Sequence, residues 1–178
     1  NGNGYVGGLV GYCFQSTITA CYATGSVNGS GTIGGLVGSN NYGSQVTACF
    51  AASVVSGTND ACGLVGTNSD SSIISCFWDM QKSGQAGSSG GKGLTTEQMK
   101  TMSIYQNAGW GAYDWVMNDG VDYPRLIWEG TSGVPIPVAV IPFAGSGTAE
   151  DPYLISTTEE FALLSWYTAI RDKEIRIT

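Results

Sequence analysis

The chain has 178 residues, with 7 basic and 14 acidic side chains, no histidine and 27 glycines. Binding to nucleic acid needs clustered Lys and Arg, so this balance excludes a basic nucleic-acid-binding protein. A hydrophobic share of 42% excludes a disordered acidic tail. No apolar run is long enough for a transmembrane helix, so we expect no membrane insertion of this segment. Without histidine, the commonest general base and metal ligand is missing, and we expect no metal, no cofactor and no catalysis.

Two short motifs recur along the first 80 residues. The first, Gly-Leu-Val-Gly, begins at residues 8, 35 and 63, which gives spacings of 27 and 28 residues. The second, Ile/Val-x-x-Cys-Tyr/Phe, ends at Tyr22, Phe50 and Phe77, with spacings of 28 and 27 residues. Since two independent motifs keep one period, we interpret residues 1–80 as internal repeats.

Each period contains two short β-like runs, such as Val6–Val10 and Ile18–Tyr22, separated by Gly, Asn and Ser. A short period with glycine corners predicts an all-β solenoid of 27–28 residues per coil, because one coil cannot bury its own apolar face. Stacked coils would lie about 4.8 Å apart. We expect the glycines that flank Leu-Val to allow positive φ and close backbone approach at tight corners.

Equivalent side chains of successive coils should stack as ladders. The expected ladders are Leu9, Leu36 and Leu64; Val10, Val37 and Val65; Cys21, Cys49 and Cys76; and Tyr22, Phe50 and Phe77. The three cysteines of one ladder allow two arrangements, buried free thiols or a disulfide between adjacent coils. Full internal pairing is excluded, because the chain has five cysteines.

The repeated Gly-Leu-Val-Gly followed by Ile/Val-x-x-Cys-Tyr/Phe resembles the GLUG repeat of bacterial surface and secreted proteins. The likeness covers residues 1–80, and residues 76–126 are similar to the closing region that often follows such repeats. This resemblance implies a right-handed β-helix and an extracellular or cell-surface location. It carries no catalytic residues to transfer.

Four segments follow from these patterns. Residues 1–93 are predicted to form solenoid coils, 94–128 a C-terminal aromatic cap, 129–144 a Pro-rich linker, and 145–178 a strand–helix–strand N-terminal cap of a following solenoid. Capping-box patterns at Thr95-x-x-Gln98 and Thr157-x-x-Glu160 predict helices over about 96–102 and 158–170. Neither end carries a targeting pattern, so we expect a piece of a longer protein.

The favoured interpretation is a non-catalytic structural module of an extracellular or cell-surface repeat protein, such as an adhesin stalk or a filament building block. Its expected partner is itself. Residues 145–178 of one copy would cap the coil edge near residues 1–11 of another, or the repeats would continue in tandem within one longer chain. A contact between unlike surfaces of identical copies produces open filaments.

Two alternatives remain open. The first is a carbohydrate-binding module that stacks sugars on the aromatic residues of the cap, Trp110, Tyr113, Trp115 and Trp128. The second is a fragment of a polysaccharide-active β-helix protein whose catalytic coils lie outside this segment. Its candidate carboxylates are Asp79, Asp114, Asp119 and Asp122, although such residues are also typical of turns.

Overall fold

The computed structural model describes residues 2–57, 61–138, 143–164 and 173–178. Its first half consists of short strands from three successive repeats. Repeat 1 comprises β1 (Tyr5–Gly7), β2 (Val10–Phe14), β3 (Thr17–Thr19) and β4 (Tyr22–Gly29). Repeat 2 comprises β5 (Thr32–Gly34), β6 (Val37–Asn41), β7 (Gln45–Thr47) and β8 (Phe50–Gly57). Repeat 3 comprises β9 (Ala61–Cys62), β10 (Val65–Ser69), β11 (Ser72–Ile74) and β12 (Phe77–Asp79).

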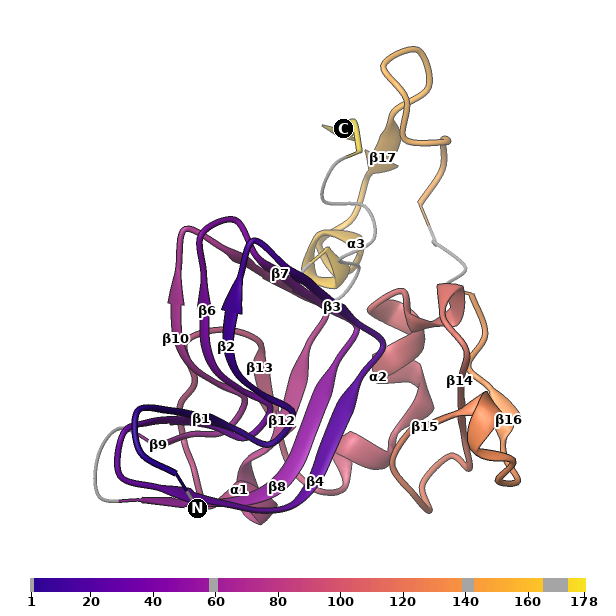
Figure 1. Cartoon of the computed structure of the whole chain (residues 1–178). Helices are drawn as coiled ribbons and strands as arrows, with labels where there is room; N and C mark the ends of the chain where they lie inside the picture. Colours follow the sequence, from indigo (N-terminus) through magenta and orange to yellow (C-terminus); the bar gives the residue numbers. More distant parts are fainter. Residues whose placement is uncertain (1, 58–60, 139–142, 165–172) are drawn as a thin grey trace.

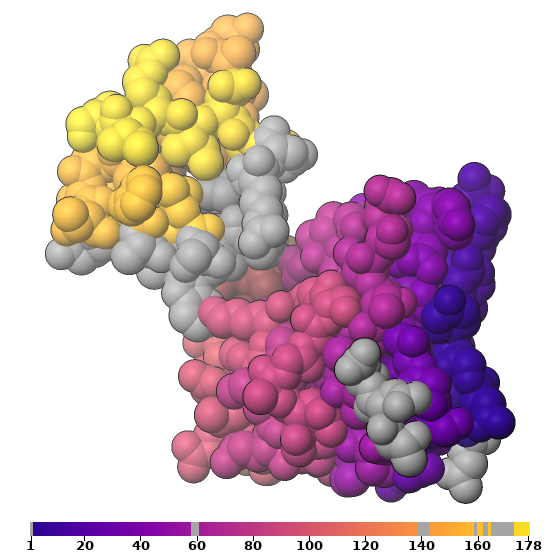
Figure 2. Space-filling view, turned by 90° about the vertical axis from the view of Figure 1, so that its left-hand side faces the viewer, coloured from indigo at the N-terminus to yellow at the C-terminus, as the bar shows by residue number. Residues whose placement is uncertain are grey.

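Each repeat contributes one strand to each of four parallel sheets. The register follows the sequence period: Tyr5 pairs with Thr32, and Tyr22 pairs with Phe50, which in turn pairs with Phe77. Equivalent strands such as β2, β6 and β10 therefore lie side by side (Figure 1). Figure 2 shows the three repeats following one another in chain order across one face. The protein is mostly β with few helices, and its parallel sheets are compatible with a β-helix.

Four strands form in each repeat where the sequence predicted two. The predicted run Val6–Val10 breaks at Gly8-Leu9, between β1 and β2, and the run Ile18–Tyr22 breaks between β3 and β4. At the second break, Ala20 has a φ of 49°, a left-handed conformation that interrupts a strand. The equivalent residues Ala48 and Ser75 have φ values of 51° and 52°.

The glycines of Gly-Leu-Val-Gly do not have positive φ, so that expectation was wrong. Non-glycine residues make the left-handed corners instead. A second left-handed corner is formed by Gln15, Tyr42 and Asp70, one from each repeat. The motif glycines serve close approach instead. A Cβ on Gly35 would lie 2.2 Å from the carbonyl oxygen of Gly63, and one on Gly8 would lie 2.3 Å from that of Gly35.

The edge of repeat 3 is covered by the segment that follows it. This segment consists of α1 (Met80–Ser83), a loop, and β13 (Lys92–Leu94), which pairs with β12. In the loop, Gly87 accepts a hydrogen bond of 2.9 Å from the Gly63 amide, and the Ser89 amide donates one of 3.0 Å to Val65. This Gly/Ser-rich stretch therefore covers part of one end of the stack.

The aromatic segment lies beside the long sheet β13-β12-β8-β4, whereas the sequence predicted a cap on the end of the stack. Figure 1 shows α2 and β14 next to β4 and β8. Its elements are η1 (Gln98–Lys100), α2 (Met102–Asn107), η2 (Trp110–Ala112), β14 (Trp115–Met117), β15 (Arg125–Leu126), η3 (Ile127–Glu129) and β16 (Val134–Pro135). The helix predicted over 96–102 is thus a 3-10 turn followed by a later helix, although Thr95 and Gln98 form the expected reciprocal cap.

The last part of the chain contains β17 (Tyr153–Ile155), α3 (Thr158–Leu163) and β18 (Ile175–Ile177). The two strands pair in parallel, and Thr157 and Glu160 form the predicted capping box at the start of α3. The predicted continuation of this helix over 165–170 lies outside the described residues, as do positions 139–142 of the Pro-rich linker.

Candidate functional site: the aromatic ladder and the free edge of repeat 1

Neighbouring residues of the second sequence motif face opposite sides of the sheet. Cys49 and Cys76 lie in the core enclosed by the repeats, together with Leu36 and Leu64. Phe50 and Phe77 belong to a separate core outside the repeats. The cysteine and aromatic ladders therefore cannot share one interior, because successive strand residues alternate between faces.

The aromatic segment packs against the aromatic ladder. The rings of Tyr22 and Phe50 stack at 5.1 Å with an interplanar angle of 3°. Trp110 and Trp115 lie 6.3 and 5.9 Å from the Phe50 ring and 4.7 Å from each other. Both tryptophans are fully buried, so they cannot stack on a sugar, which corrects their assignment as carbohydrate contacts. Of the other two predicted contacts, Tyr113 is half-buried and Trp128 is 75% exposed.

A buried carboxylate ties the aromatic segment to repeat 3. Asp79 is fully buried, and its Oδ1 accepts a 2.8 Å hydrogen bond from the Lys82 amide at the start of α1. Its Oδ2 accepts hydrogen bonds from the hydroxyls of Thr96 and Tyr123, at 2.8 and 2.7 Å. Burial and the nearby Asp79 carboxylate raise the pKa of Tyr123 to about 12. Asp79 therefore serves as a structural anchor between repeat 3, α1 and the aromatic segment.

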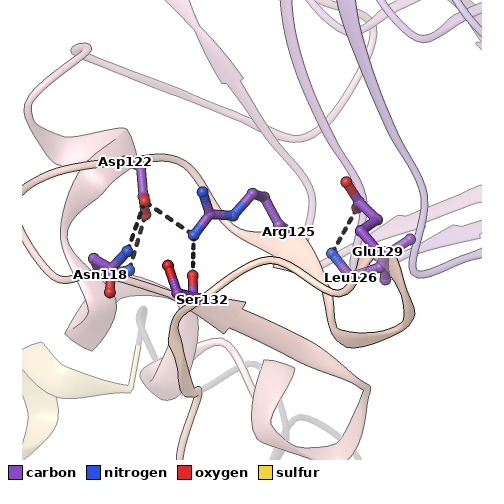
Figure 3. A network of polar contacts seen from close by, with 6 residues as sticks. All are labelled: Asn118, Asp122, Arg125, Leu126, Glu129 and Ser132. Carbon is purple, nitrogen blue, oxygen red and sulfur yellow. Dashed lines mark hydrogen bonds and ion pairs between the residues drawn. The ribbon is translucent and has the colours of Figure 1, made fainter.

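Further polar contacts fix the same segment. The indole N–H of Trp110 donates a 2.8 Å hydrogen bond to the Ser75 carbonyl, and the Tyr22 hydroxyl donates one of 2.9 Å to Glu129. Figure 3 shows a separate group of polar contacts, in which Asp122 accepts hydrogen bonds from Asn118 and pairs with Arg125 at 3.0 Å. Burial raises the pKa of Asp122, but these hydrogen bonds and the Arg125 charge outweigh that effect and lower the pKa overall.

The remaining two candidate carboxylates differ in their surroundings. Asp119 accepts a 2.8 Å hydrogen bond from the Met102 amide at the start of α2, and Asp114 is exposed. Within the described ranges, no three Cys, Asp or Glu side chains lie close enough together to hold a metal ion.

The cysteines are free thiols. The Cys49 thiol lies 3.4 Å from the Cys21 amide, and the Cys76 thiol lies 3.4 Å from the Cys49 amide, so this ladder follows the predicted register. A hydrogen bond with Cys76 and burial together raise the pKa of Cys49 far above its ordinary value. Each thiol also donates to a carbonyl two residues earlier, as Cys76 does to Ile74 at 3.1 Å.

Repeat 1 forms the free edge of all four sheets in the described part of the chain. Leu9 illustrates the difference between this edge and the interior of the stack. Its equivalents Leu36 and Leu64 are fully buried, whereas Leu9 is 46% exposed, because no strand covers its outer side. At the opposite edge, β13 pairs with β12 and the Ser89 amide bonds to Val65 of β10, so part of that edge is covered.

Parallel sheets built from equivalent strands of successive repeats define a repeat protein of the β class. A family model, the GLUG motif, matches residues 2–28, which cover repeat 1 except for its last residue, Gly29. A protein of Evansella cellulosilytica named "Putative Gly-rich membrane protein" is 29% identical over 125 residues. The aligned part is 68% of this chain but 12% of that relative. No solved structure matches the chain. Residues 2–28 therefore match the GLUG motif that the sequence resembles.

The structure was also searched for helices that could cross a membrane. No helix within the described ranges is both long enough and apolar enough to do so.

Proposed function

We propose that this segment is a non-catalytic structural module of an extracellular or cell-surface protein, in which the repeats form a right-handed β-solenoid. The module would act as a stiff spacer, as in an adhesin stalk, or as a building block of a filament. The proposed role is mechanical, and its main support is the way in which the repeats pair. The name of the E. cellulosilytica relative places that protein at a membrane, which is consistent with a surface location for this one.

The observation that carries the proposal is the in-register pairing of each repeat with the next. Over β4 and β8 the pairing is unbroken from Tyr22 with Phe50 to Gly29 with Gly57. Every such pair is held by backbone hydrogen bonds whose geometry does not depend on the side chains. A stack of this kind resists bending, because bending would stretch bonds in several sheets at once.

The charge distribution supports the same role. No Lys or Arg occurs before Lys82, and only Asp60, Asp70 and Asp79 among the first 80 residues are acidic. Parallel in-register stacking places identical positions about 4.8 Å apart, where like charges repel strongly. Nearly uncharged repeats avoid that cost.

The proposed partner is another copy of the chain or a neighbouring module of the same polypeptide. Residues 145–178 of one copy would cover the free edge of repeat 1, near residues 1–11, of the next. In support, repeat 1 provides the edge strand of all four sheets, whereas β12 of repeat 3 is paired with β13. The exposed Ile175 and Ile177 of β18 offer an apolar strand for that contact.

Light scattering and negative-stain electron microscopy of the purified chain test this proposal. We expect concentration-dependent association into rods, abolished by Leu9→Lys, which places a charge on the free edge. Val54→Lys is the matched control, because Val54 is also 46% exposed but lies on β8 in repeat 2, away from that edge. Particles that stay monomeric at every concentration would exclude assembly between copies and leave only an arrangement within one longer polypeptide.

A further inference from the structure

Exposed aromatic side chains gather on the outer surface of repeats 1 and 2. The rings of Tyr5 and Tyr12 lie 5.2 Å apart, and those of Phe14 and Tyr42 lie 5.0 Å apart. All four side chains are exposed. Tyr12 and Phe14 lie two residues apart on β2 with the buried Cys13 between them, so they share the outer face and join the two ring pairs into one platform.

The repeat pattern does not require these rings. Tyr12 pairs with Ser39, which pairs with Thr67, and Phe14 pairs with Asn41. Repeats 2 and 3 therefore hold the same backbone positions with small polar side chains. Exposure of large apolar rings to water is unfavourable in free energy, and the fold does not explain why these rings are exposed.

A polar hollow adjoins the platform at the corner of repeats 2 and 3. It has a volume of about 200 Å³ and is lined by Asn41, Tyr42, Ser69 and Asp70. In the described part of the chain, the Asp70 carboxylate and the Ser69 hydroxyl make no hydrogen bond or ion pair, and neither does the Tyr42 hydroxyl. The Tyr42 ring therefore belongs to the platform. Tyr42 also lines the hollow, together with the unbonded Ser69 hydroxyl and Asp70 carboxylate.

The exposed rings and the polar hollow together indicate which class of ligand could bind. Exposed flat rings pack against the C–H face of a sugar ring, and neighbouring amide, hydroxyl and carboxylate groups bind its hydroxyls. Phosphate, sulfate and nucleic acid need cations, and the first basic residue of the sequence is Lys82. The ligand that fits is uncharged, rich in hydroxyls and longer than one sugar unit, since the two ring pairs are separated along β2.

We propose that Tyr5, Tyr12, Phe14 and Tyr42, together with the hollow at Asn41 and Asp70, form a binding surface for neutral polysaccharides. The site lies on the repeats, away from the aromatic segment in which sugar contacts were predicted from the sequence. It goes beyond the structural role and does not depend on it, because Tyr12, Phe14 and Tyr42 are exposed outside residues 1–11, where the next copy would bind.

Affinity electrophoresis of the whole chain tests the proposal, with dextran, laminarin, pullulan or hydroxyethyl cellulose in the gel. We expect at least one neutral polymer to retard the protein, whereas dextran sulfate does not. Tyr12→Thr and Tyr42→Asn should weaken that retardation about tenfold each, the scale of one lost ring contact. Both variants suit the fold, because repeat 3 carries Thr67 at the first position and Asn tolerates the left-handed conformation at the second.

Trp128→Ala is the control, since Trp128 is an exposed aromatic side chain on η3, in the aromatic segment. It should bind as the wild type does. The proposal is overturned if no neutral polymer retards the chain, if the Tyr12 and Tyr42 variants bind unchanged while their thermal unfolding remains normal, or if only Trp128→Ala loses binding. Loss of self-association in Tyr12→Thr without any polysaccharide binding would identify the platform as a contact between copies instead.

Discussion

The hydroxyl of Tyr123 donates a 2.7 Å hydrogen bond to the buried carboxylate of Asp79, 44 residues earlier in the chain. This contact joins the aromatic segment to the last strand of repeat 3. The neighbouring Thr96 hydroxyl binds the same oxygen, so the carboxylate is shared between the stack and the segment beside it. Stability of the two parts should therefore be coupled through Asp79.

Removal of that hydroxyl in Tyr123→Phe should lower the free energy of unfolding by about 1–3 kcal/mol, because a hydrogen bond to a charged acceptor is lost. Urea unfolding at pH 7 measures the change. Tyr5→Phe is the control, since the Tyr5 hydroxyl makes no hydrogen bond in the described structure, and its effect should stay within about 0.5 kcal/mol. Equal effects of the two substitutions would show that the contact with Asp79 contributes nothing.

The same residue predicts a dependence on alkaline pH. The pKa of Tyr123 is raised from 10.0 to about 12 in the folded protein, so the unfolded chain loses this proton first. Its contribution to stability is complete below pH 10 and declines as the pH rises to about 12. Urea unfolding between pH 9 and 12 should give a shallower decline for Tyr123→Phe than for the wild type. An identical slope would contradict the assigned pKa shift.

Close backbone approach at the Gly-Leu-Val-Gly motif predicts a large effect of one methyl group. Gly35→Ala places a Cβ 2.2 Å from the carbonyl oxygen of Gly63, so repeats 2 and 3 must separate, at a cost of about 3 kcal/mol or more. Gly87→Ala is the matched control, since its Cβ would have no neighbour within 4 Å. Thermal unfolding distinguishes them, and a Gly35→Ala protein as stable as the control would refute the tight packing.

Left-handed corners predict a stabilising substitution. Gln15 has a φ of 44° and an exposed side chain, so Gln15→Gly relieves about 1–2 kcal/mol of backbone strain. The added freedom of the unfolded chain offsets about 0.4–1 kcal/mol of that gain. We expect a net stabilisation of about 0.5–1 kcal/mol in urea unfolding. Gln45→Gly, within β7, should destabilise by about the same amount, and a loss of stability in both variants would contradict the corner geometry.

Burial predicts the reactivity of the thiols. Cys49 has a strongly raised pKa and is inaccessible, so it should resist iodoacetamide at pH 8 in the folded protein. Cys21, half-buried at the free edge, should react faster, although burial also raises its pKa. Mass spectrometry of labelled peptides checks the order, with urea-unfolded protein as the reference. A disulfide between Cys21 and Cys49 before reduction would contradict the free-thiol ladder.

Much of the repeat register could be predicted from the sequence, because stacking forces equivalent residues to pair and so preserves the period. The place of the aromatic segment could not be predicted from composition, since aromatic residues suit an end cap and a lateral core equally well. One signal was available. Cys49 and Phe50 are adjacent, so a strand that buries one between the sheets must turn the other outward.

The remaining differences have local causes. Corners at Ala20 and Ala48 escaped prediction because left-handed backbone is rarely adopted by alanine, and only the surrounding sheets hold it there. The contacts of residues 84–94 with repeat 3 were missed because several are backbone-to-backbone hydrogen bonds, such as that between Gly63 and Gly87, which leave no side-chain pattern. The exposed rings of repeat 1 became conspicuous only beside their small equivalents in repeats 2 and 3.

Hydrogen exchange resolved to single amides tests most directly whether the repeats form one stack whose free edge runs along repeat 1. We expect the slowest exchange in β6 and β8, which are paired on both sides, and nearly as slow exchange in β12, which lies between β8 and β13. Repeat 1 should exchange faster along its free edge. Uniformly fast exchange through residues 5–79, with protection confined to the aromatic segment, would contradict the stack.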